Sequence, residues 1–538
     1  MLSLSAAGLL LAAPAPARAV QPPTPLLLDQ GRLDRAPALA PPADNDQAAP
    51  PIDGLARVDA AGSAAPIVGI AFEGAEVPAP VAEAARAFIG QPATRDRLDA
   101  LARAMSAAYA TSDVALYTVS IPAQDFSRGT VRVQVAEGFI EAVAYRGRAS
   151  PLLRAYAARL MAEKPLSRRA LERYLTLMRD IAGARITPQL LRGRRKGGVI
   201  LALGVARERS AFAAGFDNQG ARDLGWGQFR AEAHGYSLLR DGDRTDLTLS
   251  SATDLRRFRY ASLAHATPLG ADGLTVSLSA GYLETRPRGT PLKGTAAIAG
   301  LSFSYPVVRG YRRNLSLSLG LDGLNSDAAL VGSLISSDRT RALRLAAGYS
   351  AVAPKAVLTG GVTLSRGLDM LGARSLAGLT DTVFTKANAR ATWDRQFGKQ
   401  AILRLRAAGQ YSKGRLAASE RFAVGGPEFG RAFETALLSG DRGVAGLTEI
   451  ALRPTLPKAV AGSEIYGFVD GARLAVVPRL TQPAMRFTLA SAGIGLRLAY
   501  RDTGSFDIEA ARAIDDPYPG YRGRWRLNLG WRLSFHRR

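Results

Sequence analysis

An arginine in a long glycine-rich segment and an aspartate in a later apolar segment have the clearest potential for specific chemistry. Residues 413–442 are Gly-rich, lie between two strand-like segments and carry Arg431. Asp470 lies in the strand-like segment 465–471. A guanidinium can bind a carboxylate through two parallel hydrogen bonds, which fixes orientation as well as position. We therefore expect an Arg431–Asp470 ion pair; the alternative is a solvated loop arginine.

Other groups that commonly carry out catalysis are absent or scattered. The sequence has no cysteine, which excludes a thiolate nucleophile, a disulfide and a thiolate metal site. Its histidines, His234, His265 and His536, lie far apart and predict no metal site. Neither a Gly-x-Ser-x-Gly motif nor a phosphate-binding loop occurs. The sequence therefore predicts neither an enzyme nor a cofactor.

Strict alternation in segment 523–535 predicts an amphipathic β-strand. Its apolar face consists of Trp525, Leu527, Leu529, Trp531, Leu533 and Phe535, and its other face is rich in arginine. Such a strand suits the wall of a transmembrane barrel, with lipid on one side and water on the other. The alternative is an edge strand of a soluble sheet.

The same segment resembles the β-signal of bacterial outer-membrane proteins. That signal combines a polar residue, a glycine and two hydrophobic residues at alternate positions, here Asn528, Gly530, Leu533 and Phe535. A short tail, residues 536–538, follows the last aromatic residue.

Short amphipathic strands recur from about residue 208 to the C-terminus. They number about 16, with roughly 20 residues for each strand and loop, as in outer-membrane barrels. The formal net charge is +24, but arginines alternate with apolar residues, as in Leu403–Arg404–Leu405–Arg406. That pattern suits a barrel interior at least as well as a nucleic-acid surface. The predicted fold class is α+β periplasmic domains followed by an antiparallel transmembrane β-barrel over residues 208–538.

Upstream of the barrel, the chain divides into four segments. Residues 1–19 have a short apolar core and an Ala17–Arg18–Ala19 cleavage pattern, which predicts a signal peptide despite the missing basic n-region. Residues 20–65 are rich in Pro and Ala and predict a linker, in which 26–35 could form a helix. The patterns of residues 66–139 and 140–207 each predict one strand, two helices and two strands, in that order. The two segments therefore form an internal repeat. Exposed strand edges of such units can add a strand from an extended client.

The ordered motifs resemble those of two-partner secretion transporters of the TpsB class, the ShlB/FhaC/HecB-like haemolysin secretion/activation proteins. The resemblance covers nearly all of residues 66–538 and implies that residues 66–139 and 140–207 are polypeptide-transport-associated (POTRA) domains. In the first α/β segment, the motifs that carry the resemblance are Pro122, Gln124–Asp125, Gly129 and Glu137–Gly138–Phe139–Ile140. At the start of the barrel they are Phe216–Asp217–Asn218–Gln219–Gly220 and Gly225.

The Gly-rich segment resembles the sixth extracellular loop of that family, which folds back into the pore. Its tip is usually Val-Arg-Gly-Phe or Val-Arg-Gly-Tyr; here it reads Gly430, Arg431, Ala432 and Phe433. The partner motif on the barrel wall is usually Phe-x-Asp-x-Gly. Phe468 and Asp470 fit that motif, whereas Gly471 comes one place early. The resemblance implies that an Arg431–Asp470 pair joins the loop to the wall.

The resemblance also implies a function and partners. The protein would lie in the bacterial outer membrane, capture an unfolded TpsA-like exoprotein in the periplasm, and export it without ATP. The segment 26–35 would be a plug helix, and the barrel-assembly machinery and outer-membrane lipid would be further partners, with no role for nucleic acid. Client contacts are expected at Tyr117, Val119, Ile121, Gln124 and Asp125. The alternatives are a BamA-type insertase and, less favoured, a passive porin.

Overall fold

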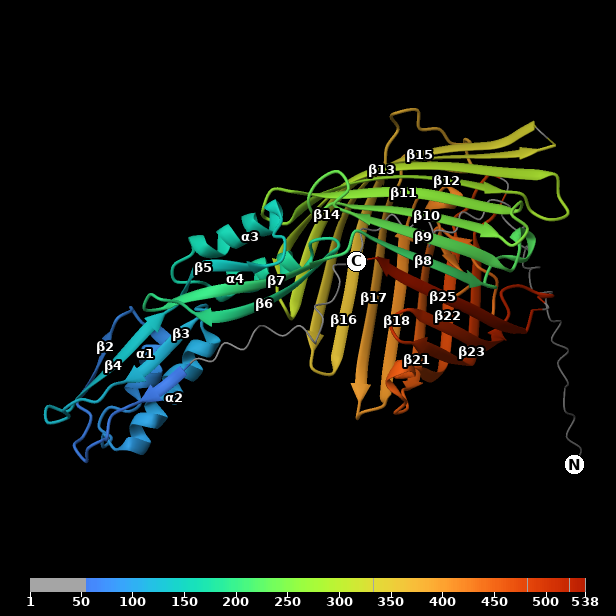
Figure 1. Ribbon diagram of the computed structural model, residues 1–538. Coiled ribbons are helices and arrows are strands. Elements are labelled where there is room, and N and C mark those ends of the chain that lie inside the picture. Colours follow the sequence, from blue (N-terminus) through green and yellow to red (C-terminus); the bar gives the residue numbers. More distant parts are fainter. Residues whose placement is uncertain (1–54, 332, 481, 522, 538) are drawn as a thin grey trace, which may run out of the picture.

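The computed structural model describes residues 55–331, 333–480, 482–521 and 523–537. Two small α/β units lead into a closed barrel that makes up most of the chain (Figure 1). The predicted signal peptide, most of the predicted linker and the predicted helix 26–35 lie outside the described residues. None of the described helices combines the length and apolar character needed to cross a bilayer.

The first α/β unit is a four-stranded sheet covered by two helices, α1 (Ala79–Arg86) and α2 (Arg95–Thr111). The sheet order is β1-β3-β4-β2. Its strands are β1 (Leu55–Val58), β2 (Gly69–Glu73), β3 (Tyr117–Ile121) and β4 (Thr130–Glu137). Helix α2 buries Leu98, Leu101 and Met105, whose spacing places them on one helical face.

Strand β1 lies inside the segment predicted to be a linker. It pairs in parallel with β3, and the pairing continues as the Asp59 N–H donates to the Ile121 carbonyl at 2.8 Å. Ala60 is fully buried in the core of the first unit. The linker prediction is therefore wrong from residue 55 onward. Four residues are too few for a periodic pattern, and their partner strand lies far along the sequence.

The second α/β unit repeats the order without the added strand. It contains β5 (Phe139–Arg146), α3 (Pro151–Ala162), α4 (Arg168–Arg179), β6 (Ala184–Arg192) and β7 (Gly198–Arg207), in the sheet order β5-β7-β6. Ser150 and Ser167 cap its helices by accepting the N–H groups of Leu153 and Ala170, each at 3.1 Å. Backbone hydrogen bonds join the two units, such as Ala115 N–H to Leu166 O at 2.9 Å.

The barrel contains sixteen strands, and each pairs antiparallel with its neighbours. Strand β25 closes it by pairing with β8, so that Gly530 faces Asp217. The strands are β8 (Ser210–Asp217), β9 (Gln228–Tyr236), β10 (Arg244–Ala252), β11 (Phe258–Leu269), β12 (Leu274–Thr285), β13 (Leu292–Arg309), β14 (Arg313–Leu330), β15 (Ser333–Ala353), β16 (Ala356–Gly367), β17 (Thr385–Phe397), β18 (Ala401–Ser412), β21 (Arg442–Leu452), β22 (Glu464–Val476), β23 (Met485–Tyr500), β24 (Gly504–Asp515) and β25 (Trp525–Arg537). The predicted fold class is confirmed.

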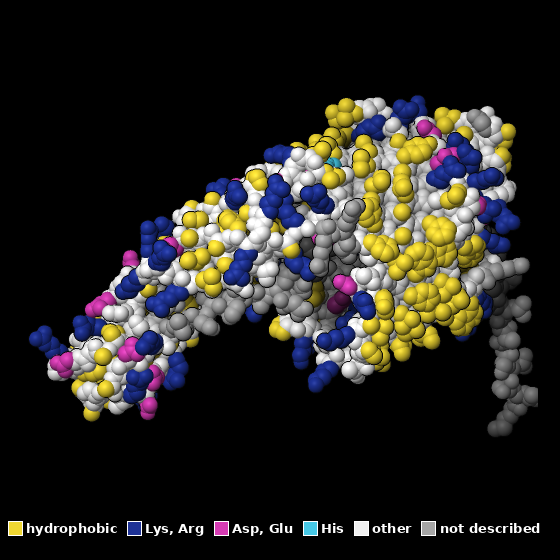
Figure 2. Space-filling model, viewed as in Figure 1, with side chains coloured by type: hydrophobic (Ala, Val, Ile, Leu, Met, Phe, Trp, Pro, Cys, Tyr) yellow, Lys and Arg dark blue, Asp and Glu magenta, His cyan; other side chains and the backbone are white. Residues whose placement is uncertain are grey.

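The two faces of the wall are also as predicted. Hydrophobic side chains gather on the outer surface of the barrel (Figure 2). On β25, the outward Trp525 and Leu527 are 68% and 54% exposed. The alternating residues Arg526 and Asn528 face inward and are only 7% and 4% exposed. Burial of the polar face inside a closed sheet requires polar partners there, and residues 413–441 between β18 and β21 supply some of them.

The second unit packs directly against turns at one end of the barrel. Asp180, just after α4, accepts a hydrogen bond from Arg309 Nε at 2.7 Å at the end of β13. Arg173 of α4 donates to the Pro306 carbonyl at 2.8 Å. The N–H of Leu152 at the start of α3 donates to Asp241 at 2.9 Å. These contacts place the second unit beside one mouth of the barrel (Figure 1).

Candidate functional site

Loop 6, residues 413–441 between β18 and β21, packs its tip against inward-facing side chains of the barrel wall. A two-stranded sheet of β19 (Phe422–Val424) and β20 (Leu438–Gly440) forms its stalk. At the tip, Arg431 is 4% exposed and Phe433 is fully buried. Gly425 permits the turn, because it has φ of +105° and a Cβ there would lie 2.2 Å from the Glu434 carbonyl oxygen.

The Arg431 guanidinium ends between two carboxylates of the wall. Its Nη1 donates to Glu449 Oε2 at 3.0 Å and to Glu509 Oε2 at 2.9 Å. Its guanidinium carbon lies 4.5 Å from the centre of the Phe468 ring. Removal of one partner from such a buried ion pair typically destabilises the structure by about 3–5 kcal/mol, because a buried charge is left uncompensated.

Asp470 is next to Arg431, but the predicted side-chain ion pair between them is wrong. Asp470 Oδ2 accepts the backbone N–H of Arg431 at 3.1 Å, and its Oδ1 accepts the Ser491 hydroxyl at 2.5 Å. The register explains the difference, because Glu449 pairs with Phe468, which lies two residues before Asp470 along β22. The tip backbone is level with Asp470, and the long arginine side chain extends past Phe468 to reach Glu449.

Two further arginines complete the charge balance around the tip. Arg404 Nη1 and Arg497 Nη1 donate to Glu449 Oε1 at 2.9 and 2.7 Å. The same two nitrogens donate to Glu464 Oε1 at 2.7 and 2.6 Å. Three guanidinium groups therefore meet three glutamates, Glu449, Glu464 and Glu509. We call these six residues the tip network; it satisfies charges that would be costly to bury alone.

The sequence prediction missed the glutamates of the tip network. A signal was present, because Glu449 and Glu509 occupy inward positions of the alternating strands β21 and β24. On an amphipathic barrel strand, an inward carboxylate near a predicted inward arginine is a candidate partner. Choosing among several such carboxylates requires the strand register, which the sequence does not give.

Asn528, predicted as part of the assembly signal, also holds the loop tip. Its Nδ2 donates to the Arg431 carbonyl at 3.0 Å and to Glu509 Oε1 at 2.9 Å. Leu533 and Phe535 are 44% and 57% exposed on the outer face. Strand β25, which closes the barrel against β8, is thus tied to loop 6. The role of these residues in assembly remains a prediction.

The other predicted motif residues pack the tip. Ala432 N–H donates to Ser491 Oγ at 3.3 Å, and Phe433 lies 5.5 Å from Tyr521, centre to centre. Gly430 has φ of +84°, and a Cβ there would lie 2.9 Å from Leu489. Gly471 is on the outward parity of β22, whereas Ala472 packs against the buried cluster at the tip. The early glycine therefore does not replace the expected inward one.

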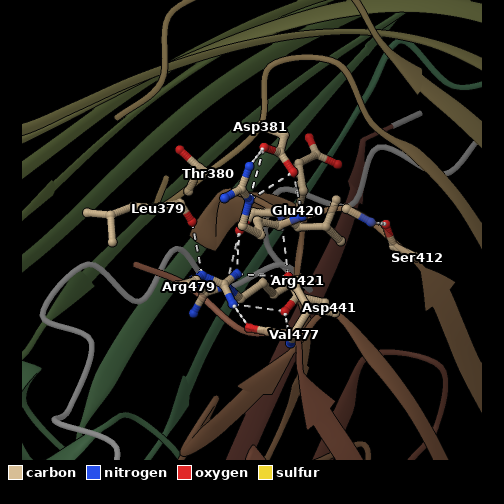
Figure 3. A network of polar contacts seen from close by, with 12 residues as sticks. Leu379, Thr380, Asp381, Ser412, Glu420, Arg421, Asp441, Val477 and Arg479 are labelled. Atoms are coloured by element: carbon tan, nitrogen blue, oxygen red, sulfur yellow. Dashed lines mark hydrogen bonds and ion pairs between the residues drawn. The ribbon is translucent and has the colours of Figure 1, made fainter. Parts of the chain in front are cut away.

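A second polar cluster fixes the base of loop 6 (Figure 3). Asp441 is fully buried and binds Arg479 through two hydrogen bonds of 2.9 and 3.0 Å. The backbone N–H groups of Leu416 and Val477 also donate to Asp441, each at 2.9 Å. Because Leu416 belongs to loop 6 and Val477 begins loop 7, residues 477–484, this cluster joins neighbouring loops.

The predicted client-contact residues lie in the first α/β unit, but not at a free edge. The side chains of Val119 and Ile121 are fully buried, and β3 pairs on both sides, with β1 and β4. The expectation of an open edge at Tyr117–Ile121 is therefore wrong. The cause is β1, which occupies that edge.

Gln124 and Asp125 stabilise the connection after β3. Gln124 accepts the Arg132 N–H at 2.7 Å and donates to the Arg132 carbonyl at 2.9 Å. The Ser127 hydroxyl donates to Asp125 at 2.6 Å and lowers the pKa of that exposed carboxyl below its usual value. These contacts give both residues a structural role in the turn.

A polar cavity of about 450 Å³ lies beside the tip. Its lining includes Arg431, Arg497 and Glu509 of the tip network together with three further charged residues, Arg230, Arg406 and Asp507. Within the described residues, no group of three or more acidic or histidine side chains could hold a metal ion. The arrangement is suited to holding and releasing a loop inside a wet barrel.

Comparison with known proteins agrees with this architecture. A sequence model of the haemolysin secretion/activation proteins ShlB/FhaC/HecB matches residues 198–498, and a model of the ShlB-type POTRA domain matches residues 65–138. No curated protein sequence matches the chain.

Solved structures share the fold at low sequence identity. CdiB from Escherichia coli has a TM-score of 0.73 at 18% identity, covering 94% of this chain and 95% of that one. CdiB from Acinetobacter baumannii has a TM-score of 0.65 at 18% identity, covering 94% and 96%. BamA from Haemophilus ducreyi, lacking POTRA domains 1–3, has a TM-score of 0.51 at 13% identity, covering 87% and 99%.

Proposed function

Because the chain belongs to the ShlB/FhaC/HecB family of haemolysin secretion/activation proteins, we propose that it captures an unfolded exoprotein in the periplasm and exports it without ATP. The protein is a two-partner secretion pore of the outer membrane, with its POTRA domains in the periplasm, and it is not an enzyme. The family implies a secreted TpsA-type client. The capture surface, the gate and the energy source are the proposed parts.

The observation that carries the proposal is the docked tip of loop 6. The tip occupies the lumen and is held by the tip network and by Asp470 and Asn528. Most of these contacts are hydrogen bonds and ion pairs beside a polar cavity, so water can replace them when the tip leaves. We propose that the tip undocks to let the client pass and docks again afterwards. Folding of the client outside the cell then favours forward movement, because it removes the transported form.

Client capture is proposed to occur at strand β6 of the second POTRA domain. Strand β6 is the counterpart of β3 in the repeat, and in the described structure it pairs only with β7. The first domain supplies a precedent, because β1 adds an extended segment to the same edge of its sheet. A client strand can therefore add to β6 in the same way.

The hydrogen-bonding direction of β6 defines which groups a client would meet. Gly193 N–H donates to Gly198 O at 2.9 Å, so odd-numbered residues of β6 bond to β7. The even-numbered backbone groups therefore face the free edge. Of these, Ile186, Leu190 and Arg192 have N–H groups to offer, whereas Pro188 has none.

The free edge of β6 ends in a strongly basic turn. Arg192 is followed by Arg194, Arg195 and Lys196 before β7 begins. The backbone N–H groups of Arg194 and Arg195 bind Glu141 at 2.9 and 3.1 Å. An extended client segment with acidic side chains would match this charge, and its binding would weaken as salt is raised.

Replacing Arg192 with proline should weaken client binding. Arg192→Pro removes a free-edge N–H that β7 does not use, together with one positive charge. Arg192→Ala removes the same charge and keeps the N–H, so it is the matched control. We expect the proline variant to bind about five- to tenfold more weakly than the alanine variant, because a hydrogen bond contributes about 1 kcal/mol.

The measurement is the affinity of the purified full-length transporter for the N-terminal region of its secreted client, identified as the exoprotein that disappears from the culture supernatant when the gene is deleted. Equal affinities for Arg192→Pro and Arg192→Ala would move the capture site away from β6. Circular dichroism of both variants verifies that the second domain still folds.

A BamA-type insertase remains the second candidate, because the BamA structure shares this fold. The two functions differ in how many proteins depend on the chain. Deleting the gene should remove one large exoprotein from the culture supernatant and leave the other outer-membrane barrels unchanged. A general loss of outer-membrane barrels would instead establish an insertase.

Two further parts of the proposal concern partners and the plug. The barrel-assembly machinery is proposed to recognise β25, whose exposed aromatic residues and inward Asn528 match an assembly signal. Residues 26–35 are proposed to plug the lumen at rest. They lie outside the described residues, so this part rests on the sequence resemblance.

A further inference from the structure

Four arginines gather on the outward face of β15, β16 and loop 5 (residues 368–384), at the extracellular end of the barrel. They are Arg339, Arg341, Arg366 and Arg374. Arg366 pairs with Leu343 across the two strands. The adjoining outward pair, Leu345 and Leu364, is 52% and 51% exposed and belongs to the lipid-facing belt. The arginines therefore begin where that belt ends.

Two of these arginines are direct neighbours across a short antiparallel bridge. The Arg339 N–H donates to the Arg374 carbonyl at 2.7 Å, and the Arg374 N–H donates to the Arg339 carbonyl at 2.9 Å. Residues paired in this way place their side chains on the same face of a sheet. Like charges directly opposite each other destabilise a sheet unless something neutralises them.

Within the described residues, none of the four arginines forms an ion pair with a carboxylate. Arg341 donates to Leu371 O at 3.1 Å and to Asn325 Oδ1 at 3.0 Å, and it lies flat over Gly323. Arg339 makes no side-chain hydrogen bond there, and its Nε is shielded from water without a partner. The terminal nitrogens of the Arg339 guanidinium also make no hydrogen bond within the described residues, so they can donate to an external acceptor.

The remaining two arginines donate only to hydroxyl groups within the described residues. Arg366 Nη1 donates to Thr385 Oγ1 at 2.6 Å, and Arg374 donates to the Ser337 hydroxyl. Ser337 in turn donates to Asp327 at 2.6 Å, so that carboxylate is connected to the cluster only through Ser337.

Some basic residues elsewhere on the extracellular rim have carboxylate partners. Arg286 and Lys293, beside the β12–β13 connection, bind Glu284 at 2.6 and 3.3 Å. Arg257 binds Asp254 at 3.0 Å. In these pairs a carboxylate of the protein already neutralises the basic side chain, unlike in the cluster on β15, β16 and loop 5.

We propose that Arg339, Arg341, Arg366 and Arg374 form a binding site for the phosphate groups of a phosphorylated glycolipid in the outer leaflet. The position selects a lipid, because the cluster lies on the outer wall directly beyond the apolar belt, where headgroups are located. The chemistry selects phosphate, because the planar guanidinium fork matches its oxygens bidentately. A bound phosphate would also offset the repulsion between Arg339 and Arg374.

The experiment measures binding of lipid A to the full-length protein purified in detergent. The probes are bis-phosphorylated lipid A, dephosphorylated lipid A and inorganic phosphate, and native mass spectrometry gives the fraction of protein with lipid bound. We expect the phosphorylated lipid to bind about tenfold or more tightly than the dephosphorylated one, given the strength of charge-assisted hydrogen bonds. Equal binding of the two lipids by the wild-type protein would overturn the proposal without any variant.

Matched variants then locate the site. Arg366→Ala/Arg374→Ala removes two exposed charges of the cluster, and Arg286→Ala/Lys293→Ala removes two charges of the same rim that already have a partner. We expect the first variant to bind phosphorylated and dephosphorylated lipid A about equally. The second variant should keep the wild-type preference for the phosphorylated lipid. Loss in both variants, or displacement of the lipid by millimolar inorganic phosphate, would instead indicate general anion attraction and refute a lipid site.

Discussion

Replacing Arg431 with alanine will stop export of the client, with a fall of at least about tenfold in secreted protein, while the barrel still assembles. The substitution leaves Glu449 and Glu509 buried without the guanidinium that lies between them. The loss of a buried partner of this kind is typically worth about 3–5 kcal/mol. The docked position of the tip would no longer be favoured, so the tip would not dock again after it leaves the wall and the proposed cycle of undocking and docking would fail.

The measurement for Arg431→Ala is the amount of client in the culture medium, normalised to the amount of transporter in outer-membrane fractions. Heat-modifiable migration on gels reports whether the barrel is folded. Arg406→Ala is the matched control, because Arg406 lines the same cavity but is outside the tip network. Normal export by a folded, membrane-localised Arg431→Ala protein would refute the role of the tip network.

A compensating change gives a sharper test of the same network. Arg431→Gln leaves an unbalanced carboxylate, and adding Glu509→Gln restores the balance of charge near Tyr466. We expect the double variant to recover part of the export lost in Arg431→Gln. Additive losses would mean that the two side chains act independently.

A disulfide between the loop tip and the barrel wall will also stop export, reversibly. Ala432→Cys and Ser491→Cys suit this purpose, because the Ala432 N–H is 3.3 Å from Ser491 Oγ. A disulfide needs about 3.5–4.5 Å between the two Cβ atoms, which this contact makes attainable. The natural chain has no cysteine, so the introduced thiols have no competing partner. We expect the oxidised protein to export at least about tenfold less client, because its tip cannot leave the lumen.

Reduction of the disulfide should restore export, and each single cysteine variant is a control for the substitutions themselves. Gel mobility under non-reducing conditions gives the fraction of cross-linked protein. Full export by a completely cross-linked population would show that the client passes without undocking of the tip. Together with Arg431→Ala, this experiment separates failure to dock from failure to undock.

The sequence contained enough information for the architecture of the barrel. The alternation of Trp525, Leu527 and Leu529 with Arg526 and Asn528 fixed the lipid and lumen faces of β25, because side chains of a strand point alternately to its two faces. The same rule applied strand after strand gave about sixteen strands. The internal repeat and the ordered motifs gave the two α/β units and the family.

Partners that lie far apart along the chain were harder to infer from the sequence. Arg431 and Asp470 were correctly brought to one place, but the guanidinium binds Glu449 and Glu509 instead. Strand β1 was missed because its four residues carry no pattern of their own. Both outcomes depend on register and on pairing between distant segments, which local periodicity does not specify.

The amino-acid order by itself thus determined which barrel residues face lipid, which face water and where most helices and strands occur. It did so because these properties follow from alternation, spacing and turn residues within short windows. The tertiary structure alone decided which carboxylates hold Arg431, which sheet edge stays unpaired in the described part of the chain, and which arginines beside β15 and β16 lack a carboxylate partner there. These properties arise only when folding sets residues far apart in the sequence at contact distance. Asn218, just after β8, shows this by donating from Nδ2 to the Leu527 carbonyl of β25 at 2.8 Å.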